Sequence, residues 1–298
     1  MIKTALYEAS ASIPDRIAEL EVLMDHASTV QLWLENGSFD NDYPFIKTTV
    51  LSQPHSAIKG QLLLDSLCRS CCVLLVSHLE GFIKDVNKAI IADLNDNVGE
   101  FSSMPESLKR SFCEKIAFYD GVPDDEKNER TKQLLAYFES NTVPINFSAF
   151  RYKESSNKNP TSNFIDNSFV KYGIHGLLNT LSKGLLYQVF ENDIHKDYKA
   201  VRHSRRDRNF LIKFPYKIYP DYYKFQYKNK KEATSTKSLW YDYIDHILNQ
   251  RHKIVHGDTT ENNSSILNLR KDIAKLNILM HGIIFSVANY LGKKFTLP

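Results

Sequence analysis

Apolar residues recur three and four positions apart along most of the chain, a spacing that predicts helices rather than strands. The longest such stretch, 61–94, is apolar on every side between Cys71 and Val76, so it is expected to lie at the centre of the core. Two segments, 38–58 and 141–162, lack this period and are predicted to be loops. The expected helices cover 14–35, 61–94, 104–119, 124–140, 169–181, most of 238–258, and 265–291.

The composition supports an all-α fold, and the length allows one large domain or two modest ones, of which we expect a single domain over residues 1–298. Of the 298 residues 42% are hydrophobic, and Gly and Pro number only 11 and 10, which leaves long stretches free of both. Cys68, Cys71 and Cys72 cluster inside one apolar helix, so buried reduced thiols are expected rather than a redox or metal pair. No stretch approaches about 18 consecutive apolar residues, and the N-terminus lacks the apolar segment of a secretory leader. We therefore expect a soluble, cytoplasmic protein that does not enter a membrane.

One segment, 195–237, has a composition of its own. It carries thirteen Lys and Arg against four Asp and Glu, a net charge of +9 in a chain whose total is +3. Aromatic residues alternate with these charges from Phe210 to Tyr227, which predicts a basic, partly extended insertion. Cations that neutralise phosphates and rings that stack on unpaired bases are typical of RNA-binding surfaces. The alternative is a solvated basic face whose aromatic side chains pack into the core. The residues expected to contact RNA are Arg202, Arg205, Arg206, Arg208 and Lys213.

The stretch 238–258 combines an apolar helix with side chains that can carry chemistry. Arg251 falls in the middle of its apolar stripe, where a permanent charge is costly unless an acceptor meets it or the side chain faces a cleft. His252 and His256 lie on the flank of this stripe, one helical turn apart. Gly257 favours the end of the helix directly after His256. One arginine and two histidines are thus expected together at a helix end.

The longest predicted helix offers a counter-charge. Glu80 stands between Leu79 and Phe82, so a buried carboxylate is expected there, with Arg251 as its partner. Arg69 lies about three turns earlier and is expected on the same face of the helix.

Three blocks of sequence resemble a known family. Residues 251–256, RHKIVH, place an arginine and a histidine five positions apart, and Gly257 and Asp258 follow. Residues 67–84 hold an arginine, an apolar run and the sequence HLEGFIK. The first block resembles the R-x4-H motif of the HEPN superfamily, and the second, with 164–181, is similar to its MAE-type bacterial branch. The resemblance implies an antiparallel helical bundle with extra helices.

The resemblance also implies a metal-independent endoribonuclease that needs no cofactor. RNA carries its own nucleophile, the 2′-OH, so cleavage requires a general base, a general acid and a positive group, which histidine and arginine supply. Arg251 and His256 diverge by about 140° on one helix, so a two-fold homodimer that apposes two such helices would complete the site. His252 replaces a residue that is often Asn in the family, which leaves its role open. The catalytic residues are then Arg251, His256 and His252, with Glu80, Arg69 and Asp258 in support.

At the level of biology, the resemblance implies a toxin or antiviral defence effector that cuts RNA such as tRNA and is controlled by a regulatory partner protein. Two other interpretations stay open. His252 and His256 have a spacing that can grip a metal ion, with Asp245 or Asp258 as an oxygen ligand. A HEPN-like fold can also serve as a non-catalytic RNA-binding or antitoxin-like module, in which Arg251 forms only a buried ion pair.

Overall fold

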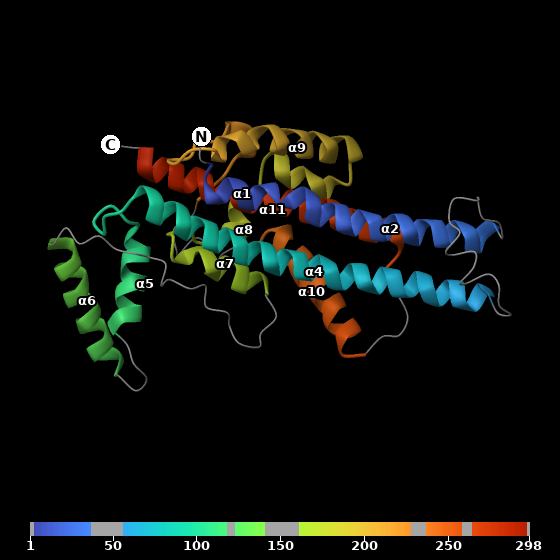
Figure 1. The fold of residues 1–298 in the computed structure, drawn as a ribbon, viewed down its shortest axis with the longest axis horizontal. Helices are drawn as coiled ribbons and strands as arrows, with labels where there is room; N and C mark the ends of the chain where they lie inside the picture. The colour runs from blue at the N-terminus through green and yellow to red at the C-terminus, as the bar shows by residue number, and fades with distance from the viewer. Residues whose placement is uncertain are drawn as a thin grey trace.

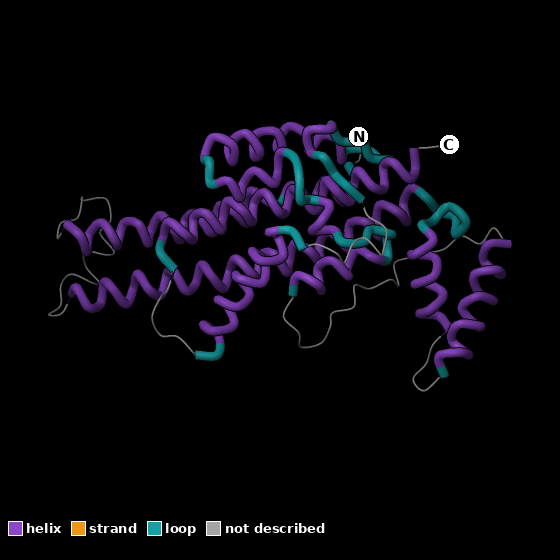
Figure 2. Tube along the Cα trace, turned by 180° about the vertical axis from the view of Figure 1, so that it is seen from behind, coloured by secondary structure: helices purple, strands orange, loops and turns teal. Residues whose placement is uncertain are grey.

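A computed structural model describes residues 3–36, 56–117, 123–140, 161–227, 237–257 and 264–296. Every regular element in these ranges is a helix, and they contain no β-strand. The expected all-α class is therefore confirmed, and helices fill the molecule in both views (Figures 1 and 2).

Three long helices form the body of the molecule. They are α2 (Ile13–Asn36), α4 (Ser56–Asn97) and α11 (Ile266–Thr296), which lie side by side along the longest axis (Figure 1). Each was expected, and α4 and α11 extend beyond the predicted bounds. Their facing side chains are fully buried, as the periodic apolar spacing requires. Examples are Leu20, Leu75, Leu79, Phe82, Leu276, Ile283 and Ile284.

Helix α4 is long and apolar enough to cross a membrane by length and composition alone. The core helix of a soluble protein passes the same test. Here α4 packs against α1, α2, α10 and α11.

A short helix, α1 (Ala5–Ala11), precedes α2 and was not expected from the sequence. The buried carboxylate of Asp93, near the end of α4, accepts hydrogen bonds from the backbone N–H groups of Ala5 and Leu6 and from the hydroxyl of Tyr216. A carboxylate is favourable at this position because the first N–H groups of a helix have no partner within the helix. Asp93 thereby joins the N-terminus, the core helix and the basic segment.

Two helices project from one end of the molecule (Figure 1), namely α5 (Glu106–Ala117) and α6 (Asp124–Ser140). Both were expected. They pack on each other through rings of Phe101, Phe112 and Phe138, whose centroids lie 5.2 to 6.2 Å apart.

The prediction of one continuous helix over 169–181 is wrong. The chain instead forms α7 (Ser162–Val170) and the short α8 (Leu177–Thr180), with a tight turn between them. Gly173 and Gly176 take positive φ angles of 90° and 63° in this turn. Because side chains rarely adopt that conformation, the two glycines end one helix and begin the next.

The strand or hairpin structure expected from Phe210 to Tyr227 is wrong, because the described part of the basic segment contains helices and irregular stretches but no strand. The segment begins with α9 (Ile194–Asp207), which follows the 3-10 helix η2 (Leu185–Glu191), and continues through η3 (Arg208–Leu211) and η4 (Asp221–Tyr223). Residues 212–220 and 224–227 are irregular and pair with no strand. Their aromatic side chains turn inward: Tyr216, Tyr219 and Tyr223 are buried in the core. The rings therefore pack the segment onto α11 instead of offering a stacking surface for bases.

Helix α10 (Leu239–Val255) lies across α4 and extends away from the bundle on the side opposite α9 (Figures 1 and 2). The long helices α2, α4 and α11 thus separate α9 from the outer end of α10. This arrangement decides which candidate residues can meet.

Candidate active site at the end of helix α10

The first part of α10 is anchored firmly in the core. Trp240, Ile244 and Ile247 are at most 1% exposed. The indole N–H of Trp240 donates to the backbone carbonyl of Leu181, and the hydroxyl of Tyr241 donates to the carboxylate of Asp166. These contacts fix the direction in which the helix leaves the bundle.

The last turn of α10 leaves the core. Val255 is 52% exposed, and His252 and His256 are exposed as well. The apolar stripe expected to run to Val255 therefore stops short of it. The helix ends at Val255, and the backbone N–H of His256 donates to the carbonyl of His252 across 3.0 Å. Gly257 follows with a φ of +75°, so the predicted helix end is confirmed.

Two imidazole rings meet at this exposed end. The ring centroids of His252 and His256 lie 4.2 Å apart, with their planes inclined at 48°. Their four-residue spacing on a helix accounts for the contact. An imidazole can accept or donate a proton near neutral pH, so the pair offers a base and an acid at one place.

Arg251 adds a permanent positive charge next to the imidazoles in the chain. Its side chain is half-buried, and its Nε atom is inaccessible to solvent. A planar guanidinium can hold two phosphate oxygens at once, which suits it to a charged transition state.

Gln250 holds this turn against the rest of the molecule. Its amide nitrogen lies 3.0 Å from Nε2 of His246 and 3.0 Å from the hydroxyl of Ser264, just before α11. On α4, the Cys72 thiol points at the side-chain oxygen of Gln250 from 3.9 Å. The candidate site thus has a fixed backbone although its imidazoles are exposed.

The two supporting residues on α4 lie in settings other than expected. Glu80 forms an ion pair with Lys84, 3.2 Å away on the next turn, and its side chain is 40% exposed. The expectation of a buried carboxylate at Glu80 is therefore wrong. Its pairing with Arg251, and a supporting role for half-buried Arg69, stay predictions. Asp258 lies outside the described residues.

Part of the HLEGFIK sequence on α4 has a packing role. His78 lies 3.2 Å from the carboxylate of Glu19 on α2. A side chain at Gly81 would meet the guanidinium of Arg16, which pairs with Asp85 across 2.7 Å. These residues therefore join α4 to α2.

A metal site of the kind considered for the two histidines finds little support in the described part of the chain. Both carboxylate oxygens of Asp245 accept hydrogen bonds from Ser162, one from its backbone N–H at 3.2 Å and one from its hydroxyl at 3.0 Å. Within the described ranges, no group of three or more His, Cys, Asp or Glu side chains is placed to hold a metal ion. Asp245 instead anchors the start of α7.

Cys68, Cys71 and Cys72 are buried reduced thiols, as expected, and Cys113 is one as well. Burial raises the pKa of Cys71 and of Cys72 to about 12, with neighbouring charges adding to the effect. Thiols that stay protonated are poor nucleophiles and poor metal ligands.

The five residues expected to contact RNA differ in their surroundings. Arg202, Arg205, Arg206 and Lys213 are exposed, and Arg206 also pairs with the buried Asp207 at 2.7 Å. Arg208 is half-buried, with its guanidinium 5.1 Å from the ring centre of Tyr7. Since α9 and the outer end of α10 lie on opposite sides of the long helices (Figure 1), the structure does not bring these cations and the histidines together.

Comparison with known proteins gives one match. A family model described as RiboL-PSP-HEPN matches residues 46–176, which include all of α4 and α7 and end before α10. No curated protein and no solved structure matches the chain. The MAE-type branch is a finer assignment than this match, and the R-x4-H motif lies beyond it. The match places residues 46–176 in the HEPN superfamily, and the helical architecture of the described residues agrees with it.

Proposed function

We propose that the protein is a metal-independent endoribonuclease whose active site is built at the end of α10. One observation carries the proposal: two exposed imidazoles with ring centroids 4.2 Å apart stand beside Arg251 on an anchored helix. Membership of a superfamily associated with RNA-related functions supports the same assignment.

In this mechanism one imidazole of the His252–His256 pair accepts the proton of a ribose 2′-OH, which attacks the adjacent phosphorus. The other imidazole donates a proton to the departing 5′-oxygen, and Arg251 neutralises the charge that develops on the phosphate oxygens. The bond to the 5′-oxygen breaks, and the upstream fragment keeps a 2′,3′-cyclic phosphate. No metal ion is required because all three groups come from side chains.

A second copy of the chain would complete this site. Arg251 and His256 lie on different sides of one helix, so a single copy cannot aim both at one phosphate without help. The exposed Val255 supplies apolar surface at the same helix end, which favours contact with another protein chain. In a two-fold homodimer the apposed ends would contribute two arginines and four histidines.

At the level of biology, we propose a toxin or antiviral defence effector that acts in the cytoplasm on an RNA such as tRNA and is restrained by a regulatory protein. The support for this role is the superfamily alone.

A second candidate is a non-catalytic RNA-binding or antitoxin-like module. The observation that favours it is the position of the exposed cations Arg202 and Arg205 on α9, away from the histidines. RNA held on that face would not reach the end of α10 of the same chain.

The test compares wild-type protein with His252→Ala and His256→Ala, using total RNA in the presence of EDTA. His195→Ala is the matched control, because His195 is also exposed but lies on α9. We expect wild type and the control to cut RNA and leave 2′,3′-cyclic phosphates. Each site variant should lose at least about 100-fold in rate, the range that general acid–base groups contribute.

The three substitutions remove exposed side chains, so the melting temperature should stay near that of wild type. Cleavage that EDTA abolishes would contradict the metal-independent mechanism. Cleavage by neither wild type nor variants, with RNA binding retained, would favour the binding module.

A further inference from the structure

A groove with a volume of about 710 Å³ lies between α2, α9 and α11. This volume falls within the range of about 300 to 1,000 Å³ that is typical of small-molecule sites. The groove is on the side of the molecule that faces away from the end of α10, so it is separate from the candidate active site (Figure 1). None of the residues proposed for RNA cleavage lines it.

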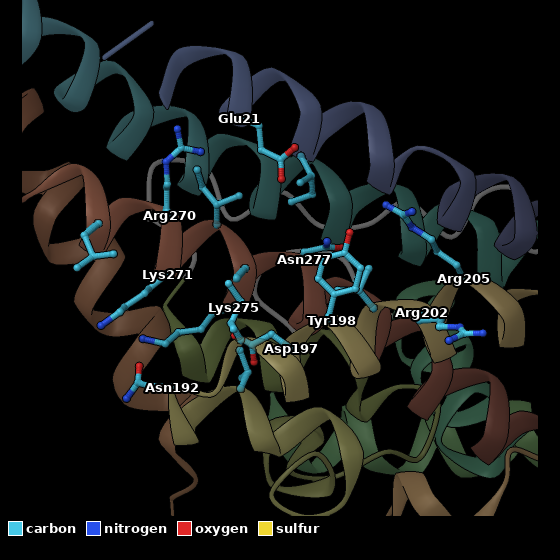
Figure 3. A pocket seen from close by; sticks show the side chains of 17 residues that line it. Glu21, Asn192, Asp197, Tyr198, Arg202, Arg205, Arg270, Lys271, Lys275 and Asn277 are labelled. Atoms are coloured by element: carbon cyan, nitrogen blue, oxygen red, sulfur yellow. The ribbon is translucent and has the colours of Figure 1, made fainter. Parts of the chain in front are cut away.

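The charges along the groove favour an anion. Five cationic side chains line it against two carboxylates, those of Glu21 and Asp197. Figure 3 shows the cations at both ends, with Arg202 and Arg205 at one and Arg270 and Lys271 at the other. Cationic groups at both ends of the groove fit a ligand with an anionic group at each of its own ends.

The middle of the groove is apolar and contains an aromatic ring. Val201 and Ile273 line it, and Tyr198 stands between the two cationic ends (Figure 3). Tyr198 is 79% exposed, which is unusual among the aromatic residues of the basic segment, because most of the others pack inward. An exposed ring beside cations is a surface on which a planar base can stack.

One buried oxygen atom at the groove accepts no hydrogen bond. Oδ1 of Asp197 is buried and has no hydrogen-bond partner, although the neighbouring Asp193 is the N-cap of α9 and has one. A buried oxygen without a donor is costly, so a ligand that presents an N–H group there would be favoured. Burial also raises the pKa of Asp197, and repulsion from Asp193 adds to the increase.

We propose that this groove binds a nucleotide that carries phosphates at both of its ends, such as a nucleoside 3′,5′-bisphosphate. Arg202 and Arg205 hold one phosphate, and Lys271 holds the other. Arg270 lends its charge at the same end but is already tied to Asp25 across 2.8 Å. The base stacks on Tyr198, and its N–H edge reaches Asp197.

Nucleotide binding at the groove does not depend on RNA cleavage, so the two proposals can fail independently. Isothermal titration calorimetry with adenosine and guanosine 3′,5′-bisphosphates measures the affinity, and the 5′-monophosphates, the nucleosides and pyrophosphate are compared. We expect the bisphosphates to bind most tightly, the monophosphates about tenfold more weakly, and the nucleosides and pyrophosphate more weakly still.

Two variants remove one cation from each end of the groove, Arg202→Ala and Lys271→Ala. Each should weaken bisphosphate binding about tenfold and should leave the bisphosphate no tighter than a monophosphate. The matched control is Lys199→Ala, an exposed cation on the same helix as Arg202 that does not line the groove, and it should change the affinity less than twofold. Asp197→Ala should weaken the bisphosphates but not pyrophosphate.

No binding of either bisphosphate at millimolar concentration would overturn the proposal. Equal loss in Lys199→Ala would also overturn it, because diffuse charge would then explain the attraction. Pyrophosphate that binds as tightly as a bisphosphate would reduce the groove to a simple anion site. A polyglutamate peptide that binds as tightly, with the same response to the variants, would assign the groove to an acidic protein segment instead.

Discussion

Replacing His281 with leucine should make the protein less sensitive to acid. His281 lies on α11, is 3% exposed, and packs beside the ring of Phe285 at 5.5 Å between centroids. Its Nδ1 atom is buried without a hydrogen-bond partner. Burial and, to a lesser extent, the positive charges of Arg208 and Arg205 lower the pKa of His281 from 6.5 to about 3.

The direction of this pH dependence follows from whether the folded or the unfolded chain takes up the proton. As the pH falls below 6.5, the unfolded chain protonates this histidine, whereas the folded chain does so only near pH 3. Folding stability is therefore full above pH 6.5 and is lost progressively toward pH 3. With about 1.4 kcal/mol for each pH unit, the loss from His281 is about 0.1 kcal/mol at pH 7.5 and about 2 kcal/mol at pH 5.

Urea unfolding at pH 7.5 and pH 5 gives the free energy of unfolding for wild type and His281→Leu. The comparison uses the difference between the two proteins, because burial raises the pKa of Asp93, Asp166 and Asp272, which contributes with the opposite sign. Wild type should lose about 2 kcal/mol more than the variant between the two pH values. Equal losses would refute the reasoning and would mean that His281 is protonated in the folded protein.

Two further substitutions test contacts that hold the fold together. Asp245→Ala removes both hydrogen bonds to Ser162 and should lower the free energy of unfolding by about 1 to 3 kcal/mol in urea titrations. Asp245→Asn should retain part of the lost stability. An unchanged unfolding midpoint in Asp245→Ala would show that α7 does not need this anchor. Gly184→Ala should destabilise by more than about 3 kcal/mol, because the new Cβ would lie 2.4 Å from the backbone oxygen of Tyr223 at a φ of +80°. Gly99→Ala is the control for Gly184→Ala, because Gly99 has a φ of +64° but no atom lies within 4 Å of the new Cβ, so a loss of about 1 kcal/mol in the free energy of unfolding is expected. Similar melting temperatures for the two variants would contradict the steric argument.

The helices that sequence patterns located correctly are those with large apolar residues on one face. Helix α9 lacks that signal because its buried side chains are Ala200, Ser204 and Asp207, which have helical spacing but are small or polar. Asp207 then accepts hydrogen bonds from the hydroxyls of Tyr222 and Tyr223. Part of the aromatic spacing that resembles a hairpin therefore reflects tyrosines that bind buried carboxylates, Asp207 here and Asp93 in the case of Tyr216, which are tertiary contacts that no local pattern encodes.

The candidate site was predictable where it depends on neighbours in the chain. The end of α10 at Gly257 and the contact between His252 and His256 both follow from helix geometry. The exposure of Val255 and the surroundings of Glu80 depend on where the core stops beneath each helix. That boundary is set by packing between distant segments, so sequence spacing placed these two residues in the interior.

The outward end of α10 has a consequence for how this protein can change over generations. Since the imidazoles are exposed and contribute little to the core, a copy that lost both of them should still fold. In the proposed homodimer, such a copy would pair with an unaltered one. Under the proposed composite site, it would lower the activity of the dimer that it joins.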